Sequence, residues 1–143
     1  MLASLGSLFV AGLLSATLLP GASELLFVQQ MLANPSHGLW LWLAVTAGNS
    51  VGGAITFFMG VGLAQLGASW QVAQKLRIRP PKATIMIYMQ RYGSWPLLFS
   101  WLPVVGDALC LAAGMLGCSR WLSLLLIVVG KAGRYALLLL LLS

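Results

Sequence analysis

This sequence has very few charged residues. Only 7% of its 143 residues are charged, against about 25% in a typical soluble domain, and only two of them are acidic. So few charges cannot cover a water-facing surface, which excludes a soluble globular domain and a disordered chain. With 60% hydrophobic residues and a mean hydropathy of +0.96, the sequence predicts a small membrane protein with a single domain over 1–143.

Residues that build metal sites and disulfide frameworks are also scarce. The one histidine, His37, lies in a predicted turn, and Cys110 and Cys118 lie in or beside apolar sequence, where buried thiols are expected. No zinc-ligand spacing and no hydrolase motif is present, so we expect no metal, no cofactor and no enzymatic activity. Nucleic acid is not an expected partner, because the basic residues adjoin apolar segments and suit a membrane surface.

Most of the basic residues lie in the middle of the chain. They predict a cytoplasmic connector over about 65–92, because Lys and Arg resist translocation. Within it, Lys82 to Tyr92 predicts a short helix with one apolar face, either in the membrane interface or as an ordinary connection. The apolar face comprises Ile85, Met86, Met89 and Tyr92, and the basic residues are Lys75, Arg77, Arg79, Lys82 and Arg91.

Four apolar segments surround this connector. Leu39–Leu63 and Trp121–Ser143 exceed the about 20 residues that a membrane-spanning helix needs. Met1–Leu32 and Gly93–Leu116 are interrupted by proline, and the residue before a proline leaves helical geometry. Each is either a kinked span or a re-entrant hairpin, and we favour hairpins. The predicted hairpin-breaking residues are Pro20, Gly21, Pro103 and Gly106.

The two halves of the chain resemble each other. Leu19-Pro20-Gly21-Ala22-Ser23-Glu24 and Leu102-Pro103-Val104-Val105-Gly106-Asp107 both read Leu-Pro-x-x-x-acid, and Gly48-Asn49 is matched by Gly130-Lys131. The same order at nearly the same spacing predicts a duplicated unit, with repeat 1 at about 1–64 and repeat 2 at about 93–143. If the second copy is inverted, Arg120 joins the other basic residues on the cytoplasmic side. The predicted fold is therefore an all-α polytopic membrane protein of two inverted repeats, each a broken hairpin plus a transmembrane helix.

The two acids are the candidate chemical groups. Glu24 and Asp107 each follow a proline by four residues, which places a carboxylate near the positive end of a half-helix. A carboxyl in lipid that exchanges between protonated and charged forms is a natural proton-coupling group.

Lys131 and Arg134 are the expected partners of these acids, because residues three apart share one face of a helix. Arg134 lies about 21 Å from one end of its helix and about 13 Å from the other, near the middle of a bilayer. Together the two cations suit a phosphate, and Asn49, at the position matching Lys131, is a further candidate for headgroup binding. The structural alternative is a set of plain ion pairs.

These motifs resemble a known family. Ser15 to Glu24 and Gly48 to Gly53, with Arg91-Tyr92-Gly93, Ser100 to Asp107 and Gly130 to Tyr135, are similar to the DedA (SNARE-associated, VTT-domain) inner-membrane proteins, YqaA-like branch. The resemblance implies a bacterial inner-membrane protein with two opposed re-entrant hairpins, and a role like that of family members that transport lipids such as undecaprenyl phosphate using the proton motive force. Their embedded acids match Glu24 and Asp107. The larger branch has arginines around the hairpin proline, where this chain has Ser100 and Gly106; Lys131 and Arg134 would supply the cations instead.

The sequence therefore predicts a proton-coupled transporter, flippase or scramblase for an anionic lipid, such as a polyprenyl phosphate or a phospholipid. Two alternatives stay open: a small proton-coupled exporter of lipophilic cations, and a non-transporting assembly or scaffold protein of the envelope. The expected partners are membrane lipids, anionic ones above all, and a second copy of the chain is a further candidate.

Overall fold

The computed structural model describes residues 1–15, 21–65, 83–102 and 105–142, and these form helices and turns without a strand. The α-helices are α1 (Leu2–Ser15), α2 (Ala22–Ala33), α3 (Gly38–Gln65), α5 (Ala83–Tyr92), α6 (Val105–Met115) and α7 (Arg120–Leu142). Two 3-10 helices, η1 (Pro35–His37) and η2 (Trp95–Trp101), connect them. The predicted all-α class is confirmed. The basic residues Lys75, Arg77, Arg79 and Lys82 lie outside the described residues.

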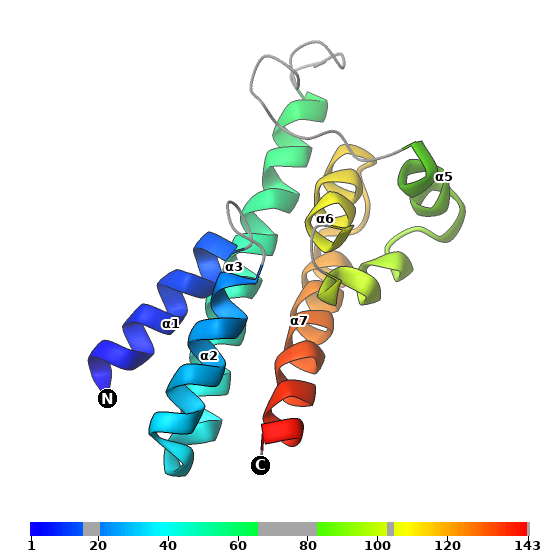
Figure 1. Cartoon of the computed structure of the whole chain (residues 1–143). Helices are drawn as coiled ribbons and strands as arrows, with labels where there is room; N and C mark the ends of the chain where they lie inside the picture. The colour runs from blue at the N-terminus through cyan, green and yellow to red at the C-terminus, as the bar shows by residue number, and fades with distance from the viewer. Residues whose placement is uncertain (16–20, 66–82, 103–104, 143) are drawn as a thin grey trace.

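Two of these helices are long and apolar enough to cross a membrane. The 28 residues of α3 and the 23 residues of α7 correspond to about 42 Å and about 34 Å, against a hydrocarbon core of about 30 Å. They run in opposite directions and pack against each other (Figure 1). The helices predicted over Leu39–Leu63 and Trp121–Ser143 are confirmed, with the second described as far as Leu142.

The first broken segment forms two shorter helices. The 14 residues of α1 and the 12 of α2 give about 21 Å and about 18 Å, too short for either to cross a bilayer alone. Gly21 precedes α2 with a φ of 98°, a left-handed conformation that interrupts the helix as predicted. Pro20 lies outside the described residues. The two helices run antiparallel beside one half of α3 (Figure 1).

The second broken segment forms η2 and α6, which pack on α7 and on the other half of α3. Pro96 lies in the first turn of η2, and Pro103 lies outside the described residues. The prediction that Gly106 breaks the hairpin is wrong, because Gly106 lies inside the first turn of α6. A Cβ there would collide with the backbone carbonyl of Ser100, so this glycine lets η2 close against α6.

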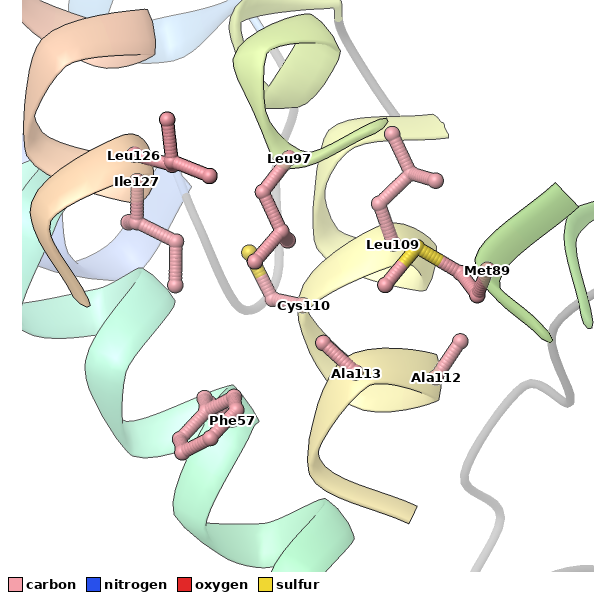
Figure 2. Close-up of a cluster of buried hydrophobic side chains, with 9 residues drawn as sticks. All are labelled: Phe57, Met89, Leu97, Leu109, Cys110, Ala112, Ala113, Leu126 and Ile127. Carbon is pink, nitrogen blue, oxygen red and sulfur yellow. The ribbon is translucent and has the colours of Figure 1, made fainter. Parts of the chain in front are cut away.

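The helices are held together by two apolar clusters. One joins α3, α5, η2, α6 and α7 (Figure 2) and comprises Phe57, Met89, Leu97, Leu109, Cys110, Ala112, Ala113, Leu126 and Ile127. The other joins α1, α2, α3 and α7 and comprises Leu8, Phe27, Met31, Leu41, Val45 and Tyr135. Cys110 is buried as predicted, whereas Cys118 is half-buried at the edge of the first cluster.

The predicted apolar face of α5 is confirmed at three of its four positions. Ile85, Met86 and Met89 pack on the first cluster. Tyr92 is 50% exposed and stacks on Tyr88 instead. The helix ends at Tyr92, before Gly93 with its φ of 65°.

Candidate functional site

Both cations predicted for the site project from one part of α7 toward its neighbours. Lys131 and Arg134 are three positions apart in the sequence, so they lie on the same side of the helix. Lys131 is 4% exposed, and Arg134, at 15%, is also largely enclosed. A charge in such a place needs partners, because removing it from water is costly.

Lys131 has two partners on two different helices. Its Nζ donates a hydrogen bond of 2.6 Å to Asn49 Oδ1 on α3 and lies 3.4 Å from Asp107 Oδ1 in the first turn of α6. The aliphatic stem passes Gly53, where a Cβ would lie only 3.0 Å from the Lys131 Cε. The small residue on α3 therefore makes room for the stem, and the ammonium ties α3, α6 and α7 together.

Arg134 pairs with the other acid. Its guanidinium forms an ion pair with Glu24, which lies in the first turn of α2. Each carboxylate therefore occupies a helix N-terminus, where the macrodipole favours negative charge, as the sequence predicts. The two acids are the more accessible members of the pairs, with 35% of the Glu24 side chain and 30% of the Asp107 side chain exposed.

Two residues that sequence reasoning did not select complete the cluster. The Tyr135 hydroxyl accepts a hydrogen bond of 2.7 Å from Asn49 Nδ2 and lies 2.7 Å from Ser23 Oγ. Ser23 and Tyr135 are 1% and 0% exposed. Tyr135 lies four residues after Lys131, a spacing that places the two side chains on the same face of the helix, and it is the last residue of the Gly130–Tyr135 motif.

All five polar residues predicted for the site therefore meet in one region: Glu24, Asn49, Asp107, Lys131 and Arg134. The structure also shows which acid pairs with which base: each acid forms an ion pair with a different cation of α7. Two acids and two bases give a cluster without net charge. Among the described residues, no group of three or more His, Cys, Asp or Glu side chains is placed to hold a metal ion.

Chemically, the cluster offers two carboxylates that can be protonated and two cations that an anion can bind. A proton on either carboxylate would cancel its charge and leave one cation without its ion partner. A guanidinium or an ammonium released in this way binds a phosphate well.

Comparison with known proteins shows several relatives over most of the chain. Inner membrane protein YqaA of Escherichia coli is 43% identical over 133 residues, covering 92% of this chain and 86% of the relative. The protein of the same name in Shigella flexneri matches to the same extent. An uncharacterized protein of Haemophilus influenzae is 37% identical over 148 residues, covering 95% of this chain and 85% of the relative. No family model matches the chain, and no solved structure matches it.

Proposed function

Because the chain belongs to the YqaA-like branch of the DedA family and is an inner-membrane protein, we propose that it moves an anionic lipid across or within that membrane in a proton-coupled cycle. One observation carries the proposal: two acids, each at a helix N-terminus, pair with two bases near the middle of a helix long enough to span the bilayer. Buried charges in lipid are costly, and ionisable residues there commonly mark substrate or proton pathways.

We also propose that the chain consists of two inverted repeats with opposed re-entrant hairpins. The support is geometric. In Figure 1, α1 and α2 run beside one half of α3, while α6 lies toward its other end and η2 packs on α7 and α6. The acid-bearing starts of α2 and α6 both reach the middle part of α7, because Glu24 and Asp107 contact residues only three positions apart. Meeting half-helices of this kind are common in transporters built from inverted repeats.

In the proposed cycle, Arg134 and Lys131 bind the phosphate of the lipid headgroup, with Asn49 holding the Lys131 ammonium in place. Proton uptake by Glu24 or Asp107 releases the paired cation for the phosphate. Loss of the proton restores the ion pair and expels the phosphate. The coupling therefore rests on competition between a carboxylate and a phosphate for the same cation.

The same arrangement favours an anion over a cation as substrate. Each carboxylate already has a cation from the chain itself as partner. A lipophilic cation would have to displace Lys131 or Arg134 and would then be repelled by it. Neutralising these two residues should weaken binding of an anionic lipid and strengthen binding of a lipophilic cation.

The test is lipid translocation by the purified protein in proteoliposomes with an imposed pH gradient. We expect Glu24→Gln and Asp107→Asn each to reduce gradient-driven translocation at least about tenfold, and the double variant to abolish it. Arg134→Gln should also abolish it. The matched control is Arg120→Gln, the same substitution at an exposed position of the same helix, which should keep its activity.

Undiminished translocation in both single acid variants and in their double variant would refute the proposal. A scaffold role makes a different prediction in cells. The Glu24→Gln, Asp107→Asn double variant would then fully restore envelope function to cells lacking the protein, which a proton-coupled transporter should not do.

A further inference from the structure

The Tyr135 hydroxyl is the point where three helices meet through hydrogen bonds. It is carried by α7, accepts a bond of 2.7 Å from Asn49 Nδ2 on α3, and lies 2.7 Å from Ser23 Oγ on α2. The Tyr135 ring is fully buried and meets Phe27 of α2 edge-on, with 5.8 Å between the ring centroids. A phenylalanine would make the same ring contacts, so the hydroxyl serves a purpose other than filling space.

The direction of these hydrogen bonds follows from the groups themselves. An ammonium only donates, so Lys131 Nζ requires the Oδ1 of Asn49 as its acceptor. This fixes the amide, whose Nδ2 then donates to the Tyr135 oxygen. The Tyr135 hydroxyl and Ser23 Oγ form the last hydrogen bond, in which either oxygen can be the donor. The chain of hydrogen bonds therefore runs from Lys131 through Asn49 and Tyr135 to Ser23.

Such a chain connects the two ion pairs. It begins at Lys131, the partner of Asp107, and ends at Ser23, the residue before Glu24. Hydrogen bonds in series polarise one another, so a change at one end alters the strength of the bond at the other. The packing interface between α2 and α7 is small, which gives this bond and the Glu24–Arg134 pair a large share in holding α2 against α7.

We propose that Tyr135 is a positioning residue that couples the protonation state of Asp107 to the position of α2, and through it to the Glu24–Arg134 pair. This inference rests on the proton-coupled function proposed above. When Asp107 is neutral, the Lys131 ammonium loses its ion partner and keeps its hydrogen bond to Asn49. The strength of that bond then changes, and with it the strength of the bond from Asn49 to Tyr135 and of the bond between Tyr135 and Ser23. The two acids then respond as one unit although they lie on different helices.

Few other charged groups face this chain of bonds. The described residues of α1, α3 and η2 carry no charged side chain. The titratable or charged groups near it are Glu24 from α2, Asp107 and Cys110 from α6, and Lys131 and Arg134 from α7, while Arg120 is exposed at the first residue of α7, eleven positions before Lys131. Of these, the two carboxylates are the groups that the proposed proton uptake would change.

The experiment measures the distance between α2 and α7 in the full-length protein in liposomes. Spin labels are placed at Leu25 and Leu137, which are 76% and 61% exposed, with Cys110 and Cys118 replaced by alanine. We expect Asp107→Asn, which imitates the protonated acid, to shift the mean distance by about 2 Å, the size of a helix shift in a switching protein. With Tyr135→Phe added, that shift should disappear.

The matched control is Tyr92→Phe, at an exposed tyrosine outside the cluster, which should leave the Asp107→Asn shift intact. Ser23→Ala removes the hydroxyl at the other end of the chain of hydrogen bonds and should act like Tyr135→Phe, so the test still stands if one of the two variants fails to fold. With Glu24→Gln present, so that α2 carries no titrating carboxylate of its own, the distance should change with pH when Tyr135 is retained and stay constant when Tyr135→Phe is added.

The inference is overturned if Asp107→Asn moves α2 equally with and without the tyrosine hydroxyl, or moves it in neither. Its failure can be told apart from failure of the proposed function. A wild-type protein that translocates no lipid but shows a Tyr135-dependent shift contradicts the transport proposal and leaves the coupling standing. Normal gradient-driven translocation without any shift contradicts the coupling alone.

Discussion

Replacing Lys131 by methionine probes the ion-pair assignment directly. Methionine keeps an unbranched apolar stem beside Gly53 and removes only the ammonium. The variant leaves Asp107 without a cation and Asn49 Oδ1 without its donor, while the Glu24–Arg134 pair is untouched. The free energy of unfolding should therefore fall mainly because two polar groups lose their common partner.

The size of this loss can be worked from the geometry. Two unit charges 3.4 Å apart attract each other by about 5 kcal/mol at an effective dielectric constant of about 20. Desolvation of the buried ammonium offsets much of this attraction. Since Asp107 is 30% exposed, water compensates part of its lost partner. We expect Lys131→Met to cost about 3 kcal/mol and the pair to show a coupling energy of about 1–2 kcal/mol.

The assay is a double-mutant cycle of Lys131→Met and Asp107→Asn, read by reversible unfolding in mixed detergent micelles. The double variant should be about as stable as Lys131→Met alone, because the uncompensated charge is gone. A crossed cycle of Lys131→Met with Glu24→Gln is the control and should couple more weakly than the matched cycle, because these two residues are linked only through the hydrogen bonds that end at Ser23. Equal coupling in the crossed and matched cycles would refute the assignment of each acid to its own cation.

Two further predictions concern packing. Gly60→Ala should lower the free energy of unfolding by about 2 kcal/mol in the same assay, because its Cβ would collide with the backbone carbonyl of Leu111 on α6. Gly62→Ala is the control: among the described residues, no heavy atom outside its own stretch of helix lies within 4 Å of the added Cβ, and a comparable loss there would contradict the reasoning. A thiol-reactive maleimide should label half-buried Cys118 at least about tenfold faster than fully buried Cys110 in the folded protein, measured by mass spectrometry of the two single-alanine variants. Equal rates would mean that α6 does not pack as described.

Much of this fold could be predicted because backbone N–H and C=O groups in lipid must form their hydrogen bonds within the protein, which favours helices. The apolar stretches of over 20 residues without a proline become the long helices α3 and α7, and Gly21 at positive φ marks the interruption before α2. The role of Gly106 could not be predicted from the sequence. A glycine can either interrupt a helix or let another segment of backbone pack closely against it, and only the position of the Ser100 backbone shows that Gly106 does the second.

The membership of the cluster could be predicted for a similar reason. Charged side chains are so rare in apolar sequence that each demands a partner. Which acid meets which base could not be predicted, since Lys131 and Arg134 share one helix face and spacing alone allows either match. Tyr135 was missed because an aromatic residue in an apolar helix is ordinarily part of the core, and only the position of Asn49 makes its hydroxyl significant.

The balance of charges in the cluster also has an electrical consequence. With both ion pairs closed, two positive and two negative charges lie together, so the membrane voltage exerts no net force on the group as a whole. One added proton leaves a net charge of +1, and moving that charge across the bilayer is worth about 2.3 kcal/mol per 100 mV. A monovalent phosphate bound beside it returns the sum to zero. In the proposed cycle, the closed site without phosphate would thus be insensitive to voltage, and the site that holds a proton but no phosphate would be the one that the membrane potential can move.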